Sequence, residues 1–232
     1  MDNDYQGKTK KGIYDFLEDE IMQNHFAELS SELLQSRHIQ KIDNRLYSIL
    51  HNQNDFSNLC KYFETLHKAT IKRKEKNREF FYYLDALENS KGIINSTFVT
   101  PLTDSLVIMG ITLLIMFNDL SFDLEKIITR EDIINKLFEG ENQDDFQRIL
   151  FGKARESVNK QRDWSGLEKK FKRWFREFER IGWLTKMGTE NDFCYRINVS
   201  IYRLEELYSD EINNLSEFSQ LVETYKLSQK IK

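Results

Sequence analysis

The chain has 232 residues, of which 40% are hydrophobic and 13% are aromatic. This composition provides enough apolar surface for a packed core and excludes a chain that is disordered throughout. The two cysteines, Cys60 and Cys194, lie far apart with no CxxC motif, which excludes a disulfide framework and argues against a zinc site. The polar, charged stretch 1–12 shows no signal-peptide pattern, so we expect a cytoplasmic protein.

The formal net charge of −4 hides a segregation of sign along the chain. Basic residues dominate 68–78, whereas 118–147 and 205–223 are acidic. Such blocks predict separate surfaces for separate partners, although a charge run is usually a solvated face.

Pro101 is the one proline, and it follows the Ser- and Thr-containing stretch 90–100. We place the domain boundary there, because such a stretch is typical of a linker. The resulting division is a flexible tail at 1–12, a first domain at 13–92, a linker at 93–105, a second domain at 106–212, and a C-terminal helix and tail at 213–232.

The first half predicts three helices and a hairpin. Apolar residues at helical spacing mark helices within 21–39, at 46–50 and at 56–67. The stretches 69–74 and 79–84 read as strands joined by a polar turn. No glycine separates the third helix from the hairpin.

The second half opens with the apolar run 106–117, which lies between Asp104 and Asn118. A membrane-spanning helix needs roughly 20 apolar residues, so this shorter run predicts a buried core helix and no membrane span. Thr129 followed by Asp132 three positions on predicts a capping box that opens a short amphipathic helix.

A long helix is predicted up to Arg180, followed by a hairpin. Its apolar stripe runs through Leu167, Phe171, Trp174, Phe175, Phe178 and Ile181. Gly182 should end the helix, and 183–187 and 193–197 should pair as strands. The predicted fold class is mainly α with small β-hairpins, arranged as tandem winged-helix domains.

No motif of nucleotide binding, metalloprotease or hydrolase chemistry occurs in the chain. The histidines His25, His38, His51 and His67 are 13, 13 and 16 residues apart, so no two share a helical turn. We therefore expect a protein that is not an enzyme and that has no catalytic residues, metal or cofactor.

Two basic surfaces, the long helix at 166–180 and the hairpin strand at 72–76, are candidates for contact with DNA, because Lys and Arg supply most of the affinity for phosphates. The alternative is a solvated outer face, since Glu168, Glu177 and Glu179 interrupt the long helix. The candidate DNA-binding residues are Lys72, Arg73, Lys74, Lys76, Lys169, Lys172, Arg173 and Arg176.

The second half contains more large apolar side chains than a small domain needs, which favours a protein interface. Ordinary core packing is the competing interpretation. The candidate interface residues are Leu106, Ile108, Ile111, Leu114, Ile115, Trp174 and Trp183.

The stretch 175–212 resembles the MukE and MksE type of accessory subunits of bacterial condensins. It carries Ile181 and Gly182 at the helix end, Arg196 and Ile197 on the returning strand, and Ser200–Arg203 after it. The apolar run and the Thr129 segment extend the resemblance over about residues 100 to 212, with the first half similar in architecture.

The resemblance implies a homodimeric subunit that binds the kleisin of an SMC-like ATPase complex, with double-stranded DNA contacted within the complex. Such complexes organise chromosomes or act against plasmids, at the nucleoid. The alternative is a stand-alone tandem winged-helix regulator or plasmid replication initiator, which should bind DNA tightly and selectively without partners.

Overall fold

The computed structural model describes residues 14–87, 102–120, 123, 125–139, 143, 144, 147, 160–189 and 192–213. The chain forms two compact units, the first from 1–75 and 80–100 and the second from 76–79 and 101–232. The predicted tail at 1–12, most of the predicted linker and nearly all of 213–232 lie outside the described residues.

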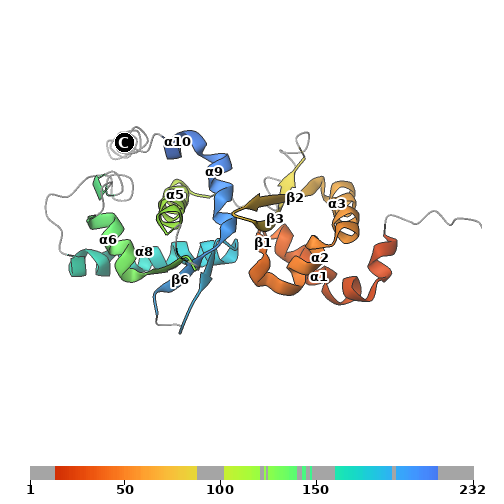
Figure 1. Ribbon diagram of the computed structural model, residues 1–232, viewed down its shortest axis with the longest axis horizontal. Coiled ribbons are helices and arrows are strands. Elements are labelled where there is room, and N and C mark those ends of the chain that lie inside the picture. The colour runs from red at the N-terminus through yellow and green to blue at the C-terminus, as the bar shows by residue number, and fades with distance from the viewer. Residues whose placement is uncertain are drawn as a thin grey trace, which may run out of the picture. The chain divides into compact units, whose positions relative to one another are not determined.

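In its described residues, the first unit contains three α-helices, a hairpin and one short additional strand (Figure 1). In chain order the elements are η1 (Asp15–Glu18), α1 (Glu20–Leu34), β1 (Ile39–Gln40), η2 (Lys41–Asp43), α2 (Asn44–His51), α3 (Gln53–His67), β2 (Ala69–Lys76) and β3 (Glu79–Ala86).

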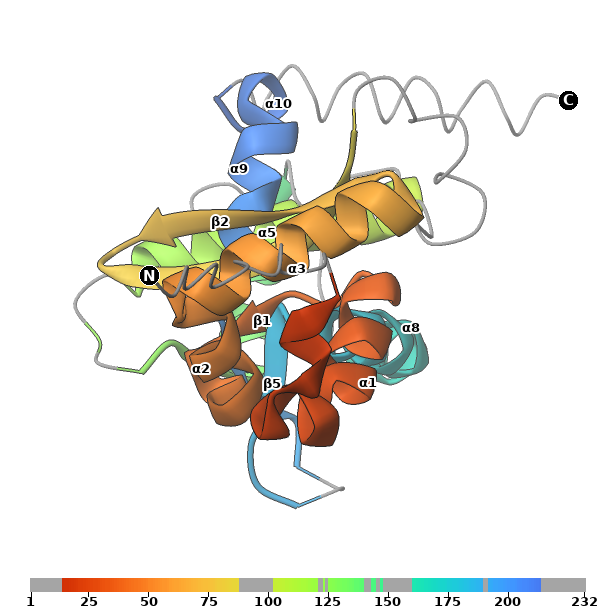
Figure 2. The ribbon, with the colours of Figure 1, turned by 90° about the vertical axis from the view of Figure 1, so that its right-hand side faces the viewer.

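The three strands form one sheet in the order β1-β3-β2, and β1 pairs antiparallel with β3 through Ile39 and Tyr82. Leu29 of α1, Leu50 of α2 and Phe63 of α3 are fully buried in one core with Tyr82. Figure 2 looks onto this unit and shows α1, α2 and α3 gathered around that core. The order helix, strand, helix, helix, hairpin is the one expected of a winged helix.

Side-chain caps and left-handed residues set the element ends in this unit. Asp19 and Asn52 accept backbone N–H bonds at the starts of α1 and α3. Lys68 ends α3 with φ of 53°, in the role that a glycine usually fills. Asn77 and Arg78 both have positive φ, as a two-residue hairpin turn requires.

The elements described in the second unit occur in the same order and continue beyond the hairpin (Figure 1). Its elements are α5 (Asp104–Asp119), β4 (Ile127–Thr129), α6 (Arg130–Phe138), α8 (Lys160–Arg180), β5 (Leu184–Lys186), β6 (Cys194–Ile197), η4 (Val199–Tyr202), α9 (Arg203–Leu207) and α10 (Ser209–Asn213). The sheet order β4-β6-β5 matches that of the first unit.

The mainly helical fold with small antiparallel sheets confirms the predicted fold class. The hairpin is paired as expected, with Leu184 opposite Ile197 and Lys186 opposite Tyr195. The capping box is also present, because Thr129 and Asp132 exchange bonds between their side chains and backbone amides.

The helix predicted within 21–39 is α1, which ends at Leu34 because Ser36 turns left-handed at φ of 64° and closes the helix end. The strands β1 and β4 were missed, since two or three residues are too few to show a period of two.

Helix α5 is the most apolar element of the second unit, and Met109, Ile111 and Leu113 are almost fully buried. It packs closely on the segment after the hairpin, where α9 and η4 lie. Across the described part of the chain, no helix combines the length and apolarity that crossing a membrane requires.

Gly110 allows this close packing. A methyl group at position 110 would lie 2.7 Å from Leu204 Cδ1 and 3.3 Å from Trp183 Cζ3. Gly110→Ala should therefore lower the free energy of unfolding, although alanine favours a helix interior by about 1 kcal/mol. We expect Leu204→Ala to destabilise by about 2–5 kcal/mol.

The double variant should lose less than the sum of the two single losses, because the new methyl group partly fills the space left by Leu204. Urea unfolding of the four proteins measures this coupling. Additive losses would contradict the contact.

Candidate nucleic-acid interface

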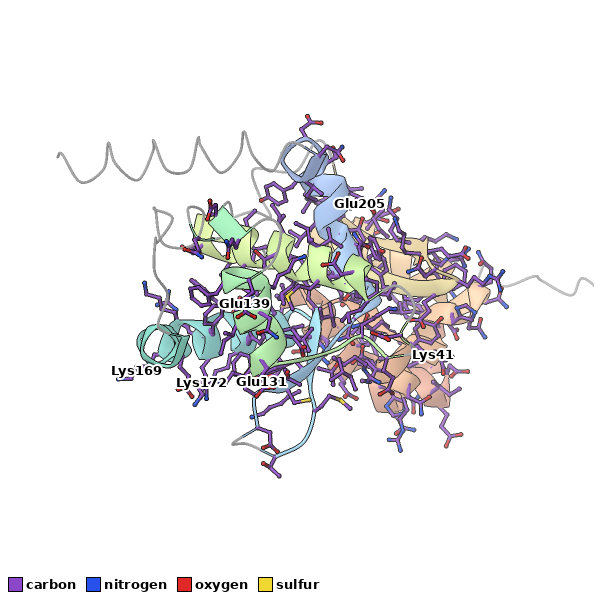
Figure 3. All side chains as sticks on the ribbon, turned by 60° about the vertical axis from the view of Figure 1, so that its left-hand side comes forward. Lys41, Glu131, Glu139, Lys169, Lys172 and Glu205 are labelled. Carbon is purple, nitrogen blue, oxygen red and sulfur yellow. The ribbon has the colours of Figure 1, made fainter. Side chains whose placement is uncertain are left out.

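Helix α8 has two opposite faces. Phe171, Trp174, Phe175 and Phe178 are buried, whereas Lys169, Lys172, Arg173 and Arg176 are exposed. At 3.6 residues per turn, the two sets lie on opposite sides of the helix. Lys169 and Lys172 project from the helix surface in Figure 3. Burial of the aromatic face therefore turns all four predicted basic residues of α8 outward.

The aromatic face packs under the hairpin. The ring centre of Phe175 lies 5.0 Å from those of both Phe193 and Tyr195, and the Tyr195 ring is edge-on to it. Such ring pairs add about 0.5–1.5 kcal/mol each beyond the area that they bury. Burial raises the pKa of the Tyr195 hydroxyl above its usual value. The hairpin therefore fixes the rotation of α8 about its own axis.

Gly182 closes α8 in the predicted manner, with φ of 85°. The amide of Gly182 donates to the Glu179 carbonyl and the amide of Trp183 to the Phe178 carbonyl, at 3.0 and 2.8 Å. These two bonds define a Schellman end. The Trp183 ring stacks on Phe178 at 5.6 Å, which is the apolar contact that accompanies this motif.

Two buried polar side chains hold the start of the hairpin. Asn198 Nδ2 donates to the Gly182 carbonyl at 2.9 Å, and Ser200 Oγ donates to the same oxygen at 3.0 Å. Asn198 Nδ2 also donates to Thr185 Oγ1 at 2.9 Å. These residues were not predicted as structural anchors, although Ser200 belongs to the motif that carried the family resemblance.

Acidic neighbours balance part of the basic face. Lys172 Nζ lies 2.8 Å from a Glu168 carboxylate oxygen, and this hydrogen bond lowers the pKa of Glu168. Glu177 pairs with Arg180 on the last turn. Pairs as exposed as these contribute at most about 1 kcal/mol, so Lys172 can exchange Glu168 for a phosphate.

Sequence reasoning missed two further basic residues near this face. Lys170 is exposed on α8 itself. Arg130, the exposed first residue of α6, lies close enough to lower the pKa of Glu168 by its charge. In the sequence, Arg130 was marked only by its position after the capping residue Thr129. Nothing in the sequence showed that α6 packs beside α8.

The predicted basic residues of β2 divide between the two faces of this strand. Neighbouring residues of a strand point to opposite sides, so Lys72, Lys74 and Lys76 share one face and Arg73 takes the other. The Arg73 guanidinium lies 5.1 Å from the centre of the Phe80 ring. The four residues therefore do not form one surface.

The predicted protein interface is largely core. Ile108, Ile111 and Leu114 are buried on α5, and Trp174 and Trp183 are 5% and 2% exposed. A partner cannot reach these five side chains while the second unit stays folded, because they fill its interior. Only Leu106 and Ile115 of the predicted set are half-buried and accessible.

The four histidines occupy unrelated environments in the first unit. His25 lies near Glu28, His38 is buried against aromatic rings, His67 packs on a phenylalanine, and His51 Nδ1 lies 3.0 Å from the Tyr82 hydroxyl. Within the described ranges, no three His, Cys, Asp or Glu side chains gather as a metal site.

The chain is thus a mainly helical protein with two small antiparallel sheets of the same strand order, and its second unit exposes a basic face on α8. The family model described as condensin complex protein MksE matches residues 24–208, which span both units. The chain therefore belongs to the MksE family of condensin complex proteins, and the resemblance seen in the sequence is confirmed. No curated protein matches the chain.

Replacing Glu168 by glutamine should strengthen binding to a polyanion, because the substitution removes the carboxylate that competes for Lys172. We expect a gain of about two- to fivefold in affinity for duplex DNA at low salt, as for a surface pair. Elution from a heparin column or DNA titration measures it. The control is Glu20→Gln, the same change on an exposed residue of α1. Equal behaviour of the two variants would argue against a role for Lys172.

Proposed function

We propose that this protein is a non-enzymatic accessory subunit of a MukBEF- or MksBEF-like SMC complex. It binds the kleisin, acts as a homodimer and contacts double-stranded DNA within the assembled complex. Its membership of the MksE family, named for a condensin complex protein, is the observation that carries this proposal.

The sequence agrees with a complex in which another subunit carries the ATPase activity. The chain contains no phosphate-binding loop, so ATP hydrolysis belongs to another subunit. The kleisin would connect this chain to that SMC-like ATPase. Both roles left to this chain, holding a partner and holding DNA, require surfaces and no catalytic group.

The basic face of α8 supports DNA contact. Helices of this kind enter the major groove or lie along the backbone, where Lys and Arg neutralise phosphates. The part of α8 whose side chains are described, 168–180, contains no Asn or Gln that could read base edges. Binding that is independent of the DNA sequence is therefore favoured. A complex that organises a whole chromosome, or that acts against plasmids, needs binding of this kind at the nucleoid.

Reversing three charges on α8 should weaken DNA binding by the complex. In the variant Lys169→Glu, Arg173→Glu, Arg176→Glu we expect at least a tenfold loss of affinity at about 0.1 M salt. The slope of log affinity against log salt should fall by about 3 in magnitude, since each lost phosphate contact contributes about 0.9. Assembly with the kleisin, followed by size-exclusion chromatography with light scattering, should be unchanged.

The matched control reverses the exposed residues Lys41, Arg45 and Lys61 of the first unit, which changes the net charge by the same amount. An equal loss in both variants would point to a nonspecific charge effect. Failure to co-purify with a kleisin and an SMC-like ATPase, combined with tight, selective DNA binding by the chain alone, would instead support a stand-alone regulator.

A further inference from the structure

A pocket of about 320 Å³ opens on the second unit between the end of α5, β4 and α6. Met116, Leu120 and Ile128 provide its apolar lining. Met116 and Ile128 are buried and Leu120 is half-buried. The volume is at the lower limit of small-molecule sites, so the pocket suits a single long side chain better than a cofactor.

Three carboxylates, one ammonium group and one amide form the polar lining, from Asp119, Asp132, Glu139, Lys136 and Asn135. Lys136 donates to Asp119, so its charge is already balanced within the rim. Asp132 accepts two bonds from Thr129 through Oδ2, each 2.7 Å long. A carboxylate has about four acceptor positions, so Asp132 can cap α6 and still accept bonds from a ligand.

We propose that this pocket binds an arginine side chain of the partner subunit through which the chain joins its complex; the inference rests on the proposed function. The stem of an arginine would pack on Met116 and Leu120, as long cationic side chains do on apolar surface. Its planar fork of donors would meet the carboxylates of Asp132 and Glu139 in paired bonds.

Other occupants fit less well. DNA phosphates would be repelled by a rim with two more carboxylates than ammonium groups. The chain's own stretch 225–232 contains three lysines and no arginine, and a lysine lacks the fork that pairs two carboxylate oxygens. The pocket also contains no residue of α8, so it is separate from the basic face.

Glu139 is the residue to change. Asp132 caps α6, and Asp119 at the end of α5 pairs with Lys136 of α6, so substituting either would also remove a contact within the second unit. Glu139 is exposed just after the last turn of α6, where a positive side chain is favourable. Glu131 provides a matched control, because it is exposed at the opposite end of the same helix and does not line the pocket (Figure 3).

The experiment titrates the full chain against fluorescently labelled partner subunit. Glu139→Arg should weaken binding at least tenfold, whereas Glu131→Arg should change it less than twofold, since a reversed charge facing the arginine acts directly. Thermal melting verifies that both variants fold. Equal affinity of the two variants would overturn the inference.

A charge swap then identifies the arginine. Each arginine of the partner is replaced by glutamate and titrated against wild type and Glu139→Arg. One replacement should weaken binding to wild type and restore most of the affinity of Glu139→Arg. If no replacement does so, or if deleting 225–232 strengthens partner binding by vacating the pocket, the inference is wrong.

A wild-type chain that binds no kleisin refutes the proposed function as well, whereas normal binding by Glu139→Arg refutes only the pocket.

Discussion

The packing of the aromatic face of α8 beneath the hairpin is the interaction on which the rest of the second unit depends. Phe171, Phe175 and Phe178 have no solvent exposure, and a helix so anchored cannot rotate without bringing several rings into water. Each ring transferred to water would cost about 1.5–3 kcal/mol. The core therefore holds the basic residues on the opposite side outward, and the exposed pair of Lys172 with Glu168 adds little to this. The defined cationic face of α8 is thus a consequence of the burial of its aromatic face.

The end of α8 explains why the family motif extends beyond the hairpin. Gly182 turns the chain, and its carbonyl receives donors from Asn198 and Ser200 on the far side of β6. Farther along, the Tyr202 hydroxyl donates to Asn118 Oδ1 at 2.7 Å and so connects the same segment to the end of α5. The bonds to the Gly182 carbonyl are buried and the Tyr202–Asn118 bond is part-buried, and together they hold the segment after β6 against the ends of α8 and α5. Satisfied buried networks of this kind favour a single arrangement over alternatives.

Much of this fold could be predicted from the sequence because its signals are local. Periodicity along α8, the capping pair at Thr129 and the glycine at 182 each act within a few residues. The strands β1 and β4 could not be found in this way, because they exist only through pairing with β3 and β6. The end of the third helix at His67 was predicted, but the left-handed conformation of Lys68 after it was not, since lysine rarely adopts that conformation.

For the candidate sites too, local features could be predicted from the sequence and features that depend on packing could not. Exposure of the basic residues on α8 followed from the helical repeat, whereas the proximity of Arg130 depends on how α6 and α8 pack. The interface prediction relied on an excess of large apolar side chains, but the second unit uses Trp174 and Trp183 to fill its own core. Acylation of lysine side chains in the assembled complex, measured by mass spectrometry with and without duplex DNA, tests directly whether the basic face of α8 contacts DNA. DNA should protect Lys169 and Lys172 while Lys41 and Lys61 stay reactive; equal reactivity of all four lysines in the presence of DNA would contradict DNA contact through α8.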